Sequence, residues 1–180
     1  MVQAIGALIA GAFYVGAKAF GTVKSGLSSN NVVKGNTFEV TSNTVPTWKG
    51  SGPAPGTIGV NSESNSVKAL QNYNPKGGIE YVFDSKTNTF VVGKPKSGLF
   101  KGSPHQQLAQ SIGADRSTVV GGTFSRGPNG EIFTTENSGH FGQNWTPEIR
   151  QQFQDTMKNY SVPVQHTDWR WILWKTIKWY

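Results

Sequence analysis

Hydrophobic residues between residues 104 and 112 recur at the spacing of a helix. The positions that share one helical face, at i, i+3, i+4 and i+7, are His105, Leu108, Ala109 and Ile112. Ser103 is a favourable N-cap, Pro104 suits the first helical position and Gly113 suits a helix end. The pattern therefore predicts a helix over residues 104–112 with His105 on its inward face.

A second helix is predicted to begin at Pro147. Thr146 precedes it as the N-cap, and Glu148 stands in its first turn, where a carboxylate is favourable. Its buried stripe is expected to consist of Ile149, Phe153, Met157 and Tyr160. We expect this helix to be scaffold.

Four segments rich in β-branched and aromatic residues predict two β-hairpins. Residues 79–84 and 89–93 form the first hairpin, joined by the sequence SKTN. Residues 117–126 and 131–136 form the second, joined by GPNG, in which Pro and Asn-Gly are strong turn formers.

A four-residue turn in the second hairpin pairs Arg126 with Glu131 and decides which side chains share a face. In this register Phe124 lies opposite Phe133 on one face. The other face is expected to carry Thr123, Ser125, Thr134 and Glu136. The pair Gly121-Gly122 weakens the strand and predicts a bulge or a close approach by another group.

Composition divides the chain into three segments. Residues 1–25 are apolar and rich in Gly and Ala, residues 26–74 are rich in Ser, Asn, Gly and Pro, and residues 75–180 carry the predicted elements. We expect residues 26–74 to be a linker or lead-in, and residues 75–180 to be the functional domain. Residues 1–25 are slightly short for a membrane span, so a buried helix, a transient membrane contact and a true anchor all stay open.

The end of the chain concentrates tryptophan next to basic residues. Four of the six tryptophans stand there: Trp169, Trp171, Trp174 and Trp179. This segment is consistent with a core element, with a platform that stacks unpaired bases, or with an interfacial segment at a membrane. His166 stands near Asp168 and is left out of the predicted site.

Charge and composition exclude several kinds of chemistry. The net charge is +7 although only 15% of residues are charged, which is compatible with a polyanionic partner. The chain has no cysteine, so disulfides, thiolate metal sites and a thiol nucleophile are excluded. Three scattered histidines give no metal-ligand spacing, and no nucleotide-binding or hydrolase motif is present, so we expect neither a metal nor a cofactor.

The candidate chemistry is metal-independent cleavage of RNA. A base takes the 2′-hydroxyl proton, an acid protonates the leaving 5′-oxygen, and histidine suits both steps because its pKa lies near neutrality. We expect His105 and His140 to divide these roles, with Glu136 as a base or orienting group. Arg126 would stabilise charge on the phosphate and Ser138 would hydrogen-bond to it. Further substrate contacts are expected from Lys94, Lys96, Thr123, Ser125, Thr134 and Trp145.

The same residues also have purely structural interpretations. His105 is consistent with a hydrogen-bonded core histidine, and His140 with a residue that caps its own loop. Arg126 is consistent with a surface pair across the strand with Glu131, which would stabilise little. Glu136 is consistent with a solvated strand end.

Four short motifs follow one another between residues 79 and 160: FVVGKP, SPHQQLA, GADRSTVVGGTFSRGPNG and SGHFGQNWTPE. This series resembles the C-terminal toxin domains of bacterial polymorphic and contact-dependent growth inhibition systems, in particular polymorphic toxin type 43, which is described as a ribonuclease class. At matching positions the resemblance implies His105, Arg126, Ser138 and His140 as polar site residues.

The resemblance implies an α+β fold of small helices packed on a twisted antiparallel sheet, similar to the barnase, EndoU, colicin and RelE group. It also implies secretion as the C-terminal part of a larger protein, cleavage of tRNA or another structured RNA in the cytoplasm of a target cell, and a cognate immunity protein. Two other functions stay open, a membrane-perturbing toxin and a transferase toxin that uses NAD.

Overall fold

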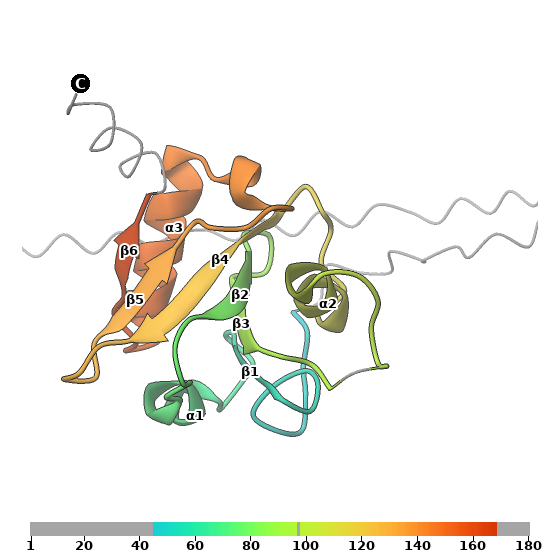
Figure 1. Ribbon diagram of the computed structural model, residues 1–180, viewed down its shortest axis with the longest axis horizontal. Helices are drawn as coiled ribbons and strands as arrows, with labels where there is room; N and C mark the ends of the chain where they lie inside the picture. The colour runs from blue at the N-terminus through green and yellow to red at the C-terminus, as the bar shows by residue number, and fades with distance from the viewer. Residues whose placement is uncertain (1–44, 97, 169–180) are drawn as a thin grey trace, which may run out of the picture. The chain divides into compact units, whose positions relative to one another are not determined.

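The computed structural model describes residues 45–96 and 98–168, which all belong to one compact unit, Thr41–Tyr180 (Figure 1). The predictions for the apolar segment 1–25 and for the tryptophan-rich end of the chain fall outside these residues. Within the described part, no helix is long and apolar enough to cross a membrane.

Six strands form one open sheet in the order β1-β3-β2-β4-β5-β6. Their bounds are β1 Thr57–Val60, β2 Ile79–Asp84, β3 Thr89–Gly93, β4 Val119–Arg126, β5 Ile132–Thr135 and β6 Gln165–Thr167. All neighbouring strands are antiparallel except β5 and β6, which run parallel. Both predicted hairpins are confirmed, and so is the α+β class, although β6 makes the sheet mixed.

Three α-helices and one 3-10 turn accompany the sheet in the described residues. They are α1 Val67–Asn72, α2 Pro104–Ser111, η1 Gly142–Asn144 and α3 Pro147–Asn159. Ser103 begins α2 as predicted: its side chain accepts from the backbone N–H of Gln106, whose side chain accepts from the Ser103 N–H in return. Thr146 caps α3 in the predicted way by accepting from the N–H of Ile149. Both helices therefore begin where their capping residues predict.

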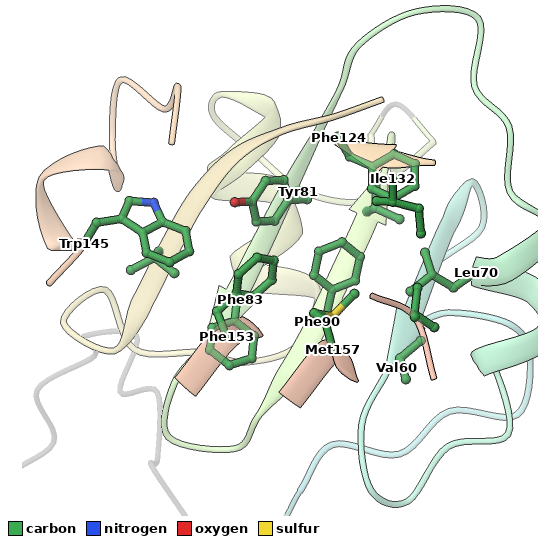
Figure 2. Close-up of a cluster of buried hydrophobic side chains, with 13 residues drawn as sticks. Val60, Leu70, Tyr81, Phe83, Phe90, Phe124, Ile132, Trp145, Phe153 and Met157 are labelled. Atoms are coloured by element: carbon green, nitrogen blue, oxygen red, sulfur yellow. The ribbon is translucent and has the colours of Figure 1, made fainter. Parts of the chain in front are cut away.

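The two longer helices cover opposite faces of the sheet. Because side chains alternate along a strand, β2 sends Tyr81 and Phe83 toward α3 and Val82 toward α2. The α3 face holds the larger core, shown in Figure 2, which includes Tyr81, Phe83, Phe90, Phe124, Trp145, Phe153 and Met157. The α2 face holds a smaller core of Val82, Val91, Leu108, Ala109, Ile112, Val119 and Phe141. His105 is only 8% exposed, which confirms its inward orientation.

β1 and α1 lie in the segment that composition assigns to a lead-in. β1 pairs with β3 as an edge strand, and Val60 and Leu70 are completely buried in the larger core. Both elements are short, and Gly, Pro, Ser and Asn flank them. Their local pattern is therefore weak, and the sheet begins before residue 75.

The predicted register of the second hairpin is wrong by one residue. The backbone N–H of Gly127 donates to the Glu131 carbonyl, so Arg126 pairs with Ile132 across a three-residue loop. Gly130 closes that loop with a φ of 86°, which favours glycine. A shift of one residue turns every side chain of β5 to the other face. Thr134 and Glu136 therefore lie on the α3 face, and Phe133 lies on the α2 face.

Candidate active site

The first turn of α2 places the His105 imidazole over the two glycines of β4. His105 Nε2 lies 3.0 Å from the Gly122 carbonyl oxygen. A carbonyl oxygen only accepts, so Nε2 carries the proton and Nδ1 keeps its lone pair. Among the described residues no hydrogen bond to Nδ1 occurs, and no fully buried side-chain nitrogen lacks a partner. The Nδ1 lone pair therefore has no hydrogen-bond donor among the described residues and can accept a proton.

His140 lies in the loop after β5 and meets the same end of α2. Its Nδ1 atom is 3.2 Å from the hydroxyl of Ser103, the N-cap residue that stands two positions before His105. The His140 side chain is partly exposed. The helix cap therefore brings together two histidines that are 35 positions apart in the sequence.

Burial decides the protonation of His105. The pKa of His105 is lowered, because burial disfavours the charged imidazolium and outweighs the opposing effects of the Gly122 carbonyl and the Glu80 carboxylate. Proximity to His140 lowers the same pKa further. His105 is therefore neutral at pH 7, the form that accepts a proton.

The two positions of β4 beneath this site, 121 and 122, have no space for a side chain. A Cβ atom on Gly121 would lie 2.9 Å from His105 Cδ2 and 3.1 Å from Ser138 Oγ. A Cβ atom on Gly122 would lie 1.6 Å from the carbonyl oxygen of Thr135. The close approach predicted for the glycine pair is confirmed.

Hydroxyl groups continue the polar surface along β4 and β5. The hydroxyls of Thr123 and Thr135 are 2.6 Å apart, and Thr135 also accepts from the backbone N–H of Asn137. Ser138 accepts from the N–H of Phe141 and so closes the loop that carries His140. These threonine and serine side chains are all partly exposed.

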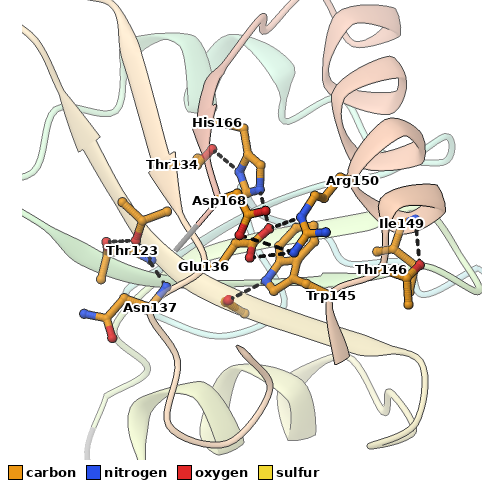
Figure 3. Close-up of polar contacts among 12 residues, drawn as sticks. Thr123, Thr134, Glu136, Asn137, Trp145, Thr146, Ile149, Arg150, His166 and Asp168 are labelled. Carbon is orange, nitrogen blue, oxygen red and sulfur yellow. Dashed lines mark hydrogen bonds and ion pairs between the residues drawn. The ribbon is translucent and has the colours of Figure 1, made fainter. Parts of the chain in front are cut away.

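A separate polar cluster lies on the α3 face, beside the larger hydrophobic core (Figure 3). Glu136 is 1% exposed and accepts from Arg150 Nε at 2.5 Å and Nη2 at 2.9 Å. His166 Nε2 lies 3.2 Å from the same carboxylate, and Asp168 lies 3.4 Å from Arg150 Nη2. The pKa of Glu136 is lowered to about 2, because the hydrogen bonds from His166 and Arg150 and the charge of Arg150 together outweigh the effect of burial. The hydroxyl of Thr134 completes the cluster by a 3.0 Å contact with His166 Nδ1.

Two other predicted site residues, Arg126 and Trp145, also lie away from the histidine pair. Arg126 donates to the carbonyls of Leu70, Gln71 and Tyr73 at the end of α1, and to Gly130. Trp145 is buried in the larger core, where its indole N–H donates to Gly121. With Glu136 and Thr134 on the α3 face, these side chains have structural partners of their own.

The two predicted lysines are exposed on the loop that follows β3. Their backbone N–H groups donate to the carbonyls of Gly56 and Pro55, next to the edge strand β1. Within the described residues, neither Lys94 nor Lys96 makes a hydrogen bond to either histidine. Their predicted role in binding phosphate stays a prediction.

Sequence patterns missed several members of these two clusters. Ser103 reads as a helix cap, and nothing local shows that it also meets His140. Arg150 is an ordinary polar position on a helix face. The neighbours His166 and Asp168 are a signal in the sequence, but their partner Glu136 is 30 positions away. In residues 45–96 and 98–168, no three side chains are arranged to hold a metal ion.

A comparison with protein families places the chain in a known group. The model of the family Bacterial toxin 43 matches residues 26–152, more than half of the chain. The chain belongs to the Bacterial toxin 43 family. The match spans both histidines of the candidate site as well as β1 and α1. No curated protein and no solved structure matches the chain.

Membership of the Bacterial toxin 43 family suggests an antibacterial toxin. It also suggests a cognate immunity protein and delivery to a target cell as part of a larger protein.

Proposed function

We propose that this toxin is a metal-independent ribonuclease in which His105 and His140 carry out the proton transfers. The observation that carries the proposal is the meeting of the two imidazoles at the N-terminus of α2, through the contact of Ser103 with His140. Next to them lies a partly exposed row of hydroxyls, and the strand below them, at Gly121-Gly122, has no side chains.

The lowered pKa of His105 favours the base role for this residue. Neutral His105 presents Nδ1 to take the proton from the ribose 2′-hydroxyl. His140, partly exposed and oriented by Ser103, then protonates the leaving 5′-oxygen. The two transfers balance: when the 2′,3′-cyclic phosphate has formed, His105 has gained one proton and His140 has lost one.

The remaining groups bind the phosphate. The N-terminus of α2 carries a partial positive charge that favours an anion. Hydroxyls of Ser138 and Thr123 can donate to phosphate oxygens, as expected from the sequence. Within this proposal the substrate is tRNA or another structured RNA in the cytoplasm of the target cell, and the immunity protein blocks this site in the producer.

Substitution of the histidines tests the proposal. The parent, His105→Ala, His140→Ala and the control Gln154→Ala, an exposed position on α3, are expressed from a tightly controlled promoter. We expect growth arrest with discrete RNA fragments from the parent and the control. Each histidine variant should cut purified RNA roughly 100- to 10,000-fold more slowly, the usual contribution of acid-base catalysis.

Three outcomes would contradict the ribonuclease proposal. Growth arrest with intact RNA would exclude it. Liposome leakage that survives loss of both histidines would favour a membrane-perturbing toxin, and modification of a target that consumes NAD would favour a transferase.

A further inference from the structure

Glu80 is a charged residue on the sheet face that carries the histidines. Along β2, Tyr81 and Phe83 point toward α3 and Val82 points toward α2, so the alternation of side chains puts Glu80 on the α2 face. The Glu80 side chain is partly exposed, and within the described residues it takes part in no ion pair. Neither the hydrophobic cores nor the proton transfers by the two histidines account for a carboxylate at this position.

The register of the sheet puts Glu80 in one row with the hydroxyl pair. Glu80 on β2 lies directly opposite Thr123 on β4. The Thr123 hydroxyl in turn lies 2.6 Å from the hydroxyl of Thr135 on β5. Side chains directly opposite one another on a sheet have Cβ atoms about 4.5 to 5.5 Å apart. The carboxylate therefore borders the polar surface of the candidate site.

His105 stands over the next row of the same face. A Cβ atom on Gly121 would lie 2.9 Å from His105 Cδ2. Gly121 is two residues before Thr123, which is about 7 Å along the strand. Glu80 is thus the diagonal neighbour of the position that the imidazole covers, at a Cβ separation of about 7 to 8 Å. A glutamate side chain spans much of that separation, so its charge acts on the imidazole without a hydrogen bond.

Among the charged groups of the surrounding elements, Glu80 is the carboxylate that acts on His105. Burial lowers the pKa of His105, the charge of Glu80 opposes that effect, and the proximity of His140 adds to it. Apart from His105, α2 and β3 contain no acidic or basic side chain. Arg126 at the far end of β4 bonds to α1, and Asp84 at the other end of β2 bonds to two threonine hydroxyls. The lysines between β3 and α2 are exposed.

A carboxylate repels a phosphate, so Glu80 beside an RNA site needs a positive charge that it can offset. His105 acquires such a charge when its Nδ1 atom takes the proton from the 2′-hydroxyl. The imidazole is buried, and burial disfavours its charged form. A nearby negative charge stabilises the imidazolium and makes His105 a stronger base, although the carboxylate itself touches no reacting atom.

We propose that Glu80 is a positioning residue for the base: its carboxylate stabilises the imidazolium that forms at His105 when the 2′-hydroxyl gives up its proton. No bond to Glu80 forms or breaks. The proton moves from the 2′-oxygen to His105 Nδ1, and Glu80 stays ionised throughout. This inference rests on the proposed ribonuclease function and adds an electrostatic component to the two histidines.

Titration of His105 tests the charge pair without any use of activity. The ring Cε1–H signals of the parent and its variants are followed by NMR from about pH 4 to about pH 9, and His105→Ala assigns the signal. Glu80→Gln removes the charge and keeps the shape, and Glu80→Asp keeps the charge on a shorter side chain. Glu63→Gln, at an exposed position between β1 and α1, is the matched control. We expect a lower pKa of His105 in Glu80→Gln, partial recovery in Glu80→Asp and no change in the control.

Cleavage of purified RNA tests the consequence for the reaction. Glu80→Gln should lower kcat about 3- to 30-fold, a part of the roughly 100- to 10,000-fold contribution of acid-base catalysis. KM should not rise, because removal of a negative charge does not weaken the binding of a polyanion. The acidic limb of the pH–rate profile should move to lower pH, since a His105 with a lower pKa is still neutral there. A residue that only supports the fold would not move this limb.

An unchanged titration of His105 in Glu80→Gln would overturn the inference, while RNA cleavage by the parent would still support the ribonuclease. A higher KM with an unchanged kcat would also overturn it and place Glu80 in substrate binding. A shifted titration together with a parent chain that cuts no RNA would leave Glu80 and His105 as a charge pair and overturn the catalytic role of both.

Discussion

Individual residues of the histidine site are constrained by space as much as by chemistry. Gly122 has no positive φ, so its backbone is one that any residue can adopt. The need for glycine comes from the neighbouring strand, whose Thr135 carbonyl occupies the place of a side chain. The close contact between the strands also places the Thr123 and Thr135 hydroxyls 2.6 Å apart.

Substitution of Gly122 by alanine is therefore expected to be costly. The added methyl group collides with backbone that cannot rotate away, and we expect a loss of about 3 kcal/mol or more in the free energy of unfolding. Gly139→Ala in the His140 loop is the control, since its Cβ atom meets nothing within 4 Å, and it should change stability by less than about 0.5 kcal/mol. Urea unfolding of both variants measures the difference; equal midpoints would contradict the steric explanation.

Among the elements, β5, β6 and α3 are joined by a buried ionic cluster. Arg150 on α3 and His166 on β6 both bond to Glu136, which directly follows β5. The His166 ring also packs on Trp145, with the ring centres 4.8 Å apart. Because the Glu136 side chain is fully buried, its charge stabilises the fold only while both hydrogen-bonding partners are present.

Stability should therefore fall in acid through Glu136. Its pKa is 4.5 in the ordinary state and about 2 in the fold, so the unfolded chain binds the proton more tightly. The contribution is fully present above pH 4.5 and is lost as the pH falls toward 2. It amounts to about 3 kcal/mol.

Glu136→Gln removes this titration while keeping the shape of the side chain. We expect the variant to be less stable than the parent at pH 6 and the gap to narrow as the pH approaches 2. Urea midpoints measured across this range provide the comparison. Parallel curves for the two proteins would show that Glu136 does not carry the acid sensitivity.

At the scale of the whole molecule, β1 and α1 belong to the sheet and its core although their sequences carry only weak patterns. Val60 and Leu70 are fully buried, and the end of α1 supplies three of the four carbonyls that bind Arg126. Loss of these elements would turn β3 into an exposed edge strand and leave a half-buried guanidinium short of acceptors.

We expect a chain that begins at residue 45 to fold cooperatively and one that begins at residue 75 to fail to do so. Removal of two fully buried apolar side chains alone costs several kcal/mol, a large part of the stability of an ordinary domain. Leu70→Ala in the longer chain should show a partial loss of about 2 to 5 kcal/mol. Circular dichroism during thermal unfolding compares the three; similar melting temperatures would place β1 and α1 outside the cooperative unit.

The amino-acid sequence by itself determined the elements whose signals are local. Ser103 and Pro104 start α2, and Thr146 and Pro147 start α3. The β-branched and aromatic residues of β2 and β3 give a hairpin with the predicted bounds. Caps, turns and hydrophobic periods act over a few residues, so a pattern in the sequence is enough to find them.

Only the tertiary structure decided which of these elements and side chains contact one another. The extra pair between Gly127 and Glu131 changed the register by one residue, which moved Glu136 away from the histidines and turned Phe133 toward them. The partners of Glu136 and the shared contact of Ser103 and His140 come from positions 14 to 37 residues apart. Such contacts depend on strand order and on which face each side chain occupies, and no local pattern records either.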